Sequence, residues 1–406
     1  TMTCLNDFSL SFKGRDFLPL MVGGMGTNIS TAELVLAIEK LGGIAHLSDA
    51  MLPDVADKAL GTHFTKERTE RLKSFIPQWD KSNNYFDLDR LADATKSYIC
   101  DVMDRAKGKG LVLVNCMEKL TMNDSLSTLK VRLNSALDAG IDGITLSAGL
   151  HLSSFKLMQE NKRFNDALLG IVVSSTRALN LFLKKTASLG RLPDYVIVEG
   201  PLAGGHLGFG DDWKNFSLEK IVREVKEFVS KDGLQIPVIA AGGIYSGKEA
   251  TRFVKEVGAD GIQAATRFTI VKESGLPDEV KQVYINAEDK DVEVNHFSPT
   301  GYPMRMLKSS PALSSDIRPN CESYGYLLNH GTCSYLKEWQ ERHQESTEAL
   351  QTKCCLCTQM RNYKVWTCGT TVSKLKETTK KGVDGKWILP TAEEVWNDYK
   401  YESFPG

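Results

Sequence analysis

Short runs of hydrophobic residues recur through the first two thirds of the chain. We predict strands at residues 18–22, 44–47, 111–115, 143–146, 170–173, 195–199, 237–241 and 261–264. These runs are apolar on both faces, which favours a covered parallel sheet over a half-exposed antiparallel one. Amphipathic helical patterns lie between them. One apolar stripe consists of Leu218, Ile221, Val222, Val225 and Val229.

Eight strands that alternate with helices predict a (β/α)8 TIM barrel, with a doubly wound sheet as the alternative. Two connections are longer than the others, at about residues 48–86 and 200–213. Both follow the carboxyl ends of predicted strands, on the face where barrel active sites form. At the first helix we expect Ser30 and Glu33 to form a capping box.

The strand and helix rhythm stops near residue 271. We therefore predict a barrel over residues 1–270, with an insertion at about 48–86, and a C-terminal extension over 271–406 that packs on it. The extension is expected to be mostly helical, and it holds six of the nine cysteines. Cys355 and Cys357 form a CxC pair but no CxxC is present, so we expect free thiols and no metal site.

Composition narrows the range of partners. The chain has 50 basic and 51 acidic residues, a net charge of −1, so no basic excess points to nucleic acid. No apolar run approaches the ~20 residues of a membrane helix, and the first residues lack the apolar region of a signal peptide. We expect a cytoplasmic protein with reduced cysteines, a small-molecule substrate and, as an open possibility, an oligomer.

Small residues mark the ends of the last two predicted strands. Gly242-Gly243 follows one strand and precedes a helix, and Ala265-Thr266 follows the other. Such residues let a ligand approach backbone N–H groups, and the helix N-termini there favour an anion. Together they predict the phosphate site of a cofactor, although either loop alone is equally typical of a tight turn.

The first and third strands end in residues suited to a flat ligand. Gly23, Gly24 and Gly26 surround Met25 directly after the first strand, which implies close contact of a ligand with the backbone. Asn115 ends the third strand with an amide that both donates and accepts hydrogen bonds. A flexible turn and a helix cap are the plainer alternatives.

His206 is the strongest catalytic candidate. It lies in a glycine-rich loop after the sixth strand, preceded by Gly204 and Gly205. An accessible histidine titrates near neutrality and can act as a general acid or base. His46 and His151, which also lie at or near strand ends, are weaker candidates.

Five segments together resemble the nitronate monooxygenase family, formerly called 2-nitropropane dioxygenases, which includes FMN-dependent type II enoyl-ACP reductases. They are GGMG at residues 23–26, VN at 114–115, AGGH at 203–206, AAGGI at 240–244 and GADGIQAATRF at 258–268. The resemblance implies a TIM barrel with FMN at its carboxyl face. His206 matches the catalytic histidine of the family.

The resemblance also assigns the cofactor-binding residues. Gly23, Gly24 and Met25 correspond to the loop beside the flavin ring, and Asn115 to a flavin contact. The ribityl and phosphate contacts correspond to Gly204, Gly242, Gly243, Gln263, Ala264, Ala265 and Thr266, and we add Gly205 and Glu199. The family often has glutamine at Glu199. A carboxylate would repel reduced flavin, so Glu199 is protonated, repositioned or the mark of another subclass.

The resemblance leaves three functions open. The first is FMN-dependent oxidation of alkyl nitronates by O2, with His206 as base or as the group that orients the anionic substrate. The second is NAD(P)H-dependent reduction of an enoyl thioester on a carrier, with His206 protonating the α-carbon. The third is a non-catalytic FMN barrel that presents its cysteine-rich segment to a partner.

Overall fold

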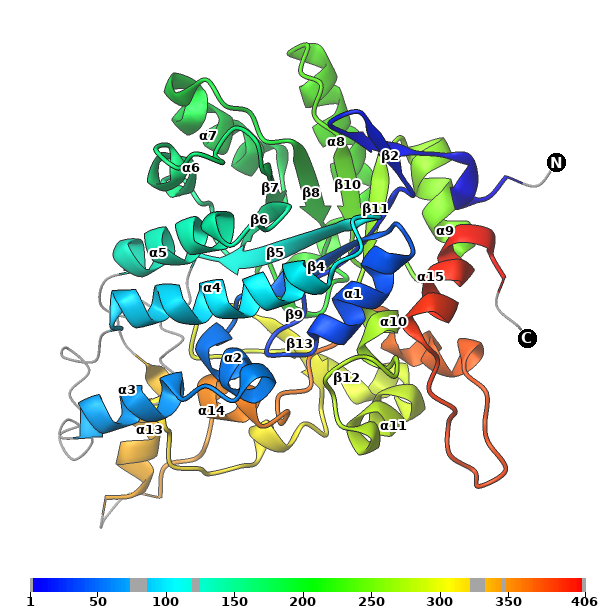
Figure 1. Ribbon diagram of the computed structural model, residues 1–406. Helices are drawn as coiled ribbons and strands as arrows, with labels where there is room; N and C mark the ends of the chain where they lie inside the picture. Colours follow the sequence, from blue (N-terminus) through cyan, green and yellow to red (C-terminus); the bar gives the residue numbers. More distant parts are fainter. Residues whose placement is uncertain (1–2, 74–85, 119–124, 322–332, 345–347, 404–406) are drawn as a thin grey trace.

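The computed structural model describes residues 3–73, 86–118, 125–321, 333–344 and 348–403. Its centre is a closed barrel of eight parallel strands (Figure 1). The strands, in order around the barrel from β3, are β3 (Leu20–Val22), β4 (Ile44–Ser48), β5 (Leu111–Met117), β6 (Gly143–Ser147), β7 (Leu168–Val173), β8 (Tyr195–Glu199), β10 (Val238–Ala241) and β11 (Gly261–Ala264). The predicted TIM barrel is confirmed, with every predicted strand in place.

Helices follow the strands and cover the outside of the barrel. They are α1 (Ala32–Lys40), α4 (Leu88–Arg105), α5 (Ser125–Asp138), α6 (Ser154–Met158), α7 (Thr176–Thr186), α8 (Leu218–Lys231) and α9 (Gly247–Arg252), which continues as a π-helical turn over Phe253–Val257. The predicted stripe on α8 is its buried face. Between β4 and α4 lie α2 (Leu52–Leu60) and α3 (Phe64–Leu72), and the rest of the predicted insertion, residues 74–85, lies outside the described residues.

The last helix, α15 (Ala392–Tyr401), completes this outer layer. After β11 comes only the short α10 (Thr266–Thr269), and α15 then packs against α1 and α9 (Figure 1). Its Val395, Trp396 and Tyr399 belong to the same hydrophobic core as the barrel strands. The place next to β11 is thus filled by a segment from the far end of the chain. The division at residue 270 stays a prediction.

An N-terminal hairpin closes the barrel at the amino ends of its strands. Strands β1 (Leu10–Phe12) and β2 (Arg15–Phe17) pair antiparallel after a 3-10 turn over Leu5–Asp7. Leu10, Phe12 and Phe17 pack against barrel residues that include Ile44 and Tyr195. Apolar side chains therefore seal this end, and the opposite end carries the polar residues described below.

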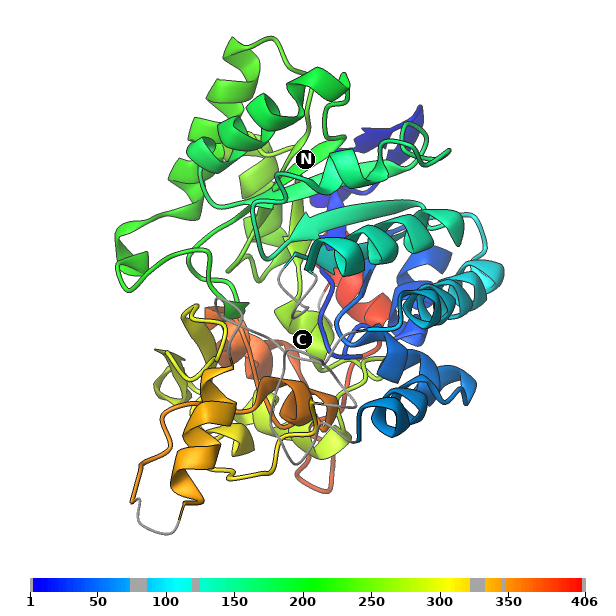
Figure 2. The same cartoon turned by 90° about the vertical axis from the view of Figure 1, so that its left-hand side faces the viewer.

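Residues between α10 and α15 form a cap that includes a sheet the sequence analysis did not predict. Strands β12 (Val292–Asn295), β13 (Met304–Leu307) and β9 (Gly205–His206) form this antiparallel sheet, in the order β12-β13-β9. The cap also contains α11 (Asp278–Asn286), α13 (Ser334–Arg342), α14 (Leu356–Arg361) and a 3-10 segment, Thr370–Thr378. In both views most of the cap lies below the barrel (Figures 1 and 2).

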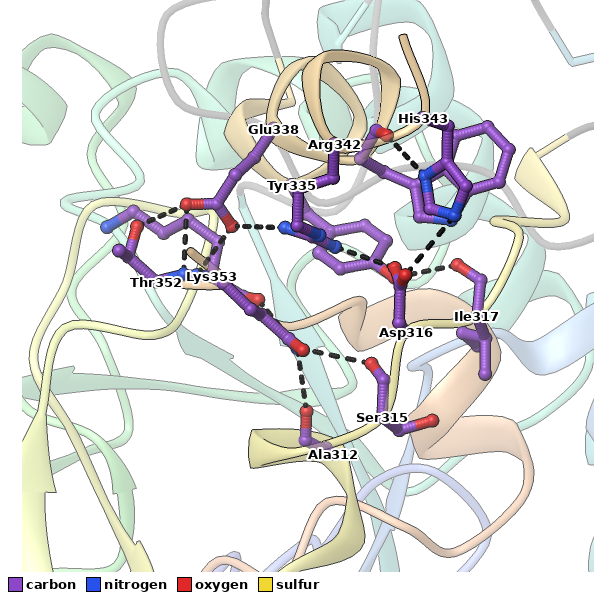
Figure 3. Close-up of polar contacts among 12 residues, drawn as sticks. Ala312, Ser315, Asp316, Ile317, Tyr335, Glu338, Arg342, His343, Thr352 and Lys353 are labelled. Carbon is purple, nitrogen blue, oxygen red and sulfur yellow. Dashed lines mark hydrogen bonds and ion pairs between the residues drawn. The ribbon is translucent and has the colours of Figure 1, made fainter. Parts of the chain in front are cut away.

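Helix α13 is fastened to the cap by a polar cluster (Figure 3). Arg342 pairs with Asp316 at 2.8 Å and with Glu338 at 3.1 Å. Glu338 also accepts the backbone N–H groups of Thr352 and Lys353. These contacts are all between neighbouring parts of the cap, so we assign them a structural role.

One predicted helix cap is wrong, and the reason bears on the site. Thr31, not Ser30, caps α1 by accepting the N–H of Leu34. Ser30 instead accepts the N–H of Met25 at 2.8 Å and donates to the carbonyl of Gly23 at 3.3 Å. Its side chain therefore stabilises the glycine-rich loop after β3. No helix among the described residues is long and apolar enough to cross a membrane.

Candidate active site

The interior of the barrel changes from apolar to polar along the strands. Because side chains alternate along a strand, the apolar interior positions Met21, Leu113 and Ile197 are followed by polar ones nearer the carboxyl ends. These polar interior residues are Ser48, Asn115, Ser147, Glu199 and Gln263. These five residues form a layer of polar side chains at the carboxyl end of the barrel, under the cap, which we call the polar floor.

Glycines after β3 lie directly over this floor. A Cβ on Gly24 would lie 2.8 Å from the Cβ of Asn115, and one on Gly23 would lie 3.3 Å from the side-chain amide of Gln263. The predicted flavin contacts from β3, β5 and β11 are thus brought together. Asn115 also accepts a hydrogen bond from the hydroxyl of Ser147.

The two predicted phosphate loops are neighbours, as parallel pairing of β10 with β11 requires. Gly242 and Gly243 have φ of +104° and +84°, values that side chains other than glycine rarely adopt. Thr266 begins α10 beside them. The Gly242-Gly243 loop therefore has a backbone that glycine favours, and phosphate binding at the two loops stays a prediction.

The cap reaches these loops through Gly369. A Cβ on Gly204 would lie 2.6 Å from the backbone nitrogen of Gly369, and one on Gly369 would lie 2.9 Å from Oγ1 of Thr266. The N–H of Thr370 donates to the carbonyl of Leu202 at 3.2 Å. The backbone at Gly369 therefore joins the loop after β8 to the end of β11.

His206 lies on β9, which pairs with β13 of the cap. Its Nε2 lies 2.7 Å from Oγ of Ser298, and Ser298 in turn hydrogen-bonds Thr300 at 2.6 Å. The ring is half-buried, and removal of water lowers the pKa of His206 from 6.5 to about 4. The imidazole is therefore neutral at pH 7, and its Nδ1 makes no hydrogen bond with the described residues.

The two weaker histidine candidates are structural. His46 donates from Nδ1 to the carbonyl of Val22 at 2.8 Å, so its Nε2 accepts from Thr145 at 2.7 Å. His151 donates from Nε2 to the carbonyl of Ser147 at 2.6 Å and accepts from Ser154 at 2.7 Å. Both rings are fully buried, and burial lowers the pKa of each to about 4. Neither is available to a substrate.

Glu199 and Gln263 carry polar atoms that have no partner among the described residues. Burial raises the pKa of Glu199 from 4.5 to about 7, and none of the described residues pairs with its carboxyl group. Oε1 of Gln263 is buried without a hydrogen bond among the described residues. Such buried groups indicate a ligand that supplies the missing partner. The raised pKa favours the protonated alternative for Glu199.

The cysteines of the cap are mostly buried. Burial raises the pKa of the Cys354 and Cys368 thiols to about 12, so both are protonated at neutral pH. Among the described residues no group of three or more His, Cys, Asp or Glu side chains is arranged to hold a metal ion. The absence of a metal centre stays a prediction.

The sequence analysis missed three residues that the cap contributes. Ser298 and Thr300 lie in the turn-like SPTGYP segment at residues 298–303, and Arg305 follows it. Nothing in the sequence of this segment connects it with His206. Only the pairing of β9 with β13 does so.

A sequence model of the nitronate monooxygenase family matches residues 15–326. The chain belongs to the nitronate monooxygenase family. As a member it is a flavin-dependent oxidoreductase, and the third possibility, a non-catalytic barrel, is set aside.

Relatives of the chain differ in the activities that their names give. The chain is 22% identical over 303 residues to a probable nitronate monooxygenase of Staphylococcus saprophyticus, and the match covers 72% of this chain and 76% of the relative. It is 34% identical over 140 residues, 34% of this chain, to a (3aS,4S,5R,7aS)-5-hydroxy-7a-methyl-1-oxo-octahydro-1H-indene-4-carboxyl-CoA dehydrogenase of Rhodococcus jostii. That match spans 35% of the relative.

Solved structures share the fold. The nitroalkane oxidase of Streptomyces ansochromogenes superposes with a TM-score of 0.58 at 15% identity, covering 94% of each chain. FabK of Thermotoga maritima superposes with a TM-score of 0.54 at 18% identity, covering 94% of this chain and 91% of its own. At these identities the likeness concerns the barrel with its cap and not the substrate.

The residues present fit a flavin. Gly24 leaves room over Asn115 that a Cβ would fill. Oε1 of Gln263 is buried and accepts no hydrogen bond from the described residues. The small residues after β10, Gly242-Gly243, and after β11, Ala265-Thr266, suit a phosphate. These three features lie at the carboxyl ends of barrel strands, where TIM barrels bind cofactors.

Proposed function

We propose that the protein binds FMN and oxidises alkyl nitronates with O2. The observation that carries this proposal is the neutral His206, half-buried on β9 in the loop after β8, with an Nδ1 that makes no hydrogen bond with the described residues. FMN would be held by Gly23, Gly24 and Asn115 at its ring, and by Gln263 and the loops after β10 and β11 at its ribityl chain and phosphate. It would supply the electron transfer between substrate and O2.

The hydroxyl partner of His206 decides what its ring can do. A serine hydroxyl both donates and accepts, so Ser298 is compatible with a proton on either nitrogen of His206. With the proton on Nδ1, His206 donates a hydrogen bond to an anionic substrate. With the proton on Nε2, Nδ1 is a base. His46 and His151 lack this choice because each donates to a carbonyl.

Enoyl-thioester reduction with NAD(P)H is the second candidate. The observation in its favour is the 34% identity to a relative that acts, by its name, on a CoA thioester. The same His206 would then protonate the α-carbon and be reprotonated through Ser298. A small molecule is the substrate in the first case, and an acyl thioester on a carrier in the second.

One experiment separates the two candidates. The flavin is reduced anaerobically with an alkyl nitronate, NADH or NADPH in separate stopped-flow runs. Rapid reduction by the nitronate alone supports the first function. Rapid reduction by NADH or NADPH, followed by reoxidation with an enoyl thioester, overturns it in favour of the second.

The identity of the cofactor is tested by fluorescence titration. We expect about one FMN per chain, bound more tightly than riboflavin because riboflavin lacks the phosphate that the loops after β10 and β11 receive. Equal affinity for the two would remove the phosphate site from the proposal.

A further inference from the structure

Arg305, on β13, is a buried arginine without a carboxylate partner in the described part of the chain. Its side chain is 1% exposed, and burial lowers its pKa below the usual value. Its Nη2 is buried without a hydrogen bond among the described residues. Burying an unpaired guanidinium costs free energy, so a specific set of contacts must hold it.

Those contacts are made with the loop that leads to His206. Nη1 of Arg305 donates to the carbonyl of Pro201 at 2.8 Å and to that of Ala203 at 2.6 Å. The guanidinium of Arg305 therefore links the residues directly before and after Leu202. Hydrogen bonds from a charged donor are stronger than neutral ones, so this turn is held firmly.

The backbone of Arg305 holds the other side of the same loop. Arg305 is paired with Gly205, and Met304 with His206, across β13 and β9. The carbonyl of Arg305 also accepts the N–H of Cys368 at 3.3 Å. Because side chains alternate along a strand, the guanidinium lies on the face away from His206. Arg305 can therefore act on His206 only through the loop.

The ring of Trp213 covers the guanidinium. Cζ of Arg305 lies 4.5 Å from the centroid of this ring, a cation–π distance. Lysine would keep the charge, but its compact ammonium group lacks the planar face that stacks on Trp213.

We propose that Arg305 is a positioning residue that fixes the 201–205 turn and thereby holds the imidazole of His206 against Ser298. The proposal rests on the role of His206 in the proposed function, and it does not depend on which substrate is used.

The test measures the titration of His206 in the flavin-bound protein by NMR of labelled histidine, with its signal assigned from His206→Ala. We expect Arg305→Ala to let water reach the ring and to raise the His206 pKa by about one unit or more towards 6.5, since the charged hydrogen bonds are lost. Millimolar guanidinium should bind in the vacated space and reverse the shift. Arg305→Lys should give an intermediate value.

Arg191→Ala is the matched control. Arg191 also donates to backbone carbonyls, those of Phe164 and Ala167, but just before β8 at the amino end of the barrel. We expect its removal to leave the His206 titration unchanged. An unchanged titration in folded Arg305→Ala would overturn the proposal, and if that variant does not fold, an unchanged titration in Arg305→Lys would do so.

Turnover gives a second measurement. If the protein oxidises nitronates, Arg305→Ala should lower kcat about tenfold or more with a smaller change in KM, and guanidinium should restore it. Loss of kcat without rescue, together with an unchanged titration, would show a purely structural role. Absence of nitronate turnover in the wild type would count against the proposed function and leave the titration result intact.

Discussion

Arg267, directly after the last barrel strand, forms a buried ion pair with Asp398 of the last helix at 2.5 Å. The Arg267 guanidinium also donates to the carbonyl of Tyr245 at 3.3 Å and lies over the rings of Tyr245 and Tyr399. The side chains of Arg267 and Asp398 are 4% and 10% exposed. The end of the barrel and the end of the described chain are therefore joined by one buried pair.

We expect Asp398→Ala to lower the free energy of unfolding by about 3–5 kcal/mol, because it leaves the Arg267 charge buried without its partner. Urea unfolding followed by circular dichroism measures the change. Glu219→Ala, which breaks the exposed pairs of Glu219 with Arg223 and Arg252, is the control and should cost less than about 1 kcal/mol. Equal effects of the two variants would contradict the importance of the buried pair.

Gly24→Ala should weaken flavin binding. The new methyl group would lie 2.8 Å from Cβ of Asn115 and 3.0 Å from the carbonyl of Leu47, so the loop must move. Overpacking of this kind costs about 1–3 kcal/mol, which corresponds to a rise of about five- to 150-fold in the dissociation constant. Fluorescence titration measures it. Gly210→Ala, which meets only the side chain of Asp212 at 3.3 Å, should bind flavin as the wild type does.

His206→Ala should keep its flavin and lose turnover by about 10²- to 10⁴-fold, the usual contribution of a placed proton-transfer group. If the protein oxidises nitronates, the loss should fall on reduction of the flavin by substrate. If it reduces enoyl thioesters, reduction by NAD(P)H should be spared and reoxidation should slow. His296→Ala is the control, because His296 is exposed and pairs with Asp211. Near-normal turnover of His206→Ala would remove this residue from the mechanism.

Stability should fall when the pH drops below neutrality. His46, His151 and His206 have folded-state pKa values of about 4, below the ordinary 6.5. Between these values the unfolded chain binds more protons, so each histidine contributes stability that is lost as the pH falls from about 6.5 to about 4. Glu199 acts in the opposite sense between about 4.5 and 7, because its folded-state pKa is raised.

From these four groups together, the unfolded chain binds two protons more than the folded chain at about pH 5.5. The free energy of unfolding therefore changes by about 3 kcal/mol per pH unit at most. Urea unfolding at several pH values measures it. His151→Asn should remove the contribution of one proton from this pH dependence. The same slope in His151→Asn and the wild type would show that His151 does not titrate as proposed.

The barrel could be predicted from the sequence because its signals are local. Each strand is a short apolar run, and each loop that bears a predicted site residue follows directly from its own strand, as Gly242 follows β10 and Ala265 follows β11. Pairing between neighbouring parallel strands then brings these loops together without further information. The same reasoning placed Gly24, Asn115 and Gln263 together at the carboxyl end of the barrel.

The contribution of the cap could not be predicted in this way. Ser298 reaches His206 because β9, only two residues long, pairs with β13 from about a hundred residues later. So short a strand has no periodicity, and a pairing so distant leaves no mark on the local pattern. The assignment of Ser30 failed for a related reason, since its hydroxyl serves the loop before it and not the helix after it.

The position of α15 has a consequence for the order of events during protein synthesis. Helices α1 and α9 lack the helix that packs against them until residues 392–401 have left the ribosome, and His206 lacks Ser298 until the cap has been made. Nascent chains generally fold as units from the amino end. Here the outer layer of the barrel and the contact of Ser298 with His206 can be completed only after nearly the whole described chain has been translated.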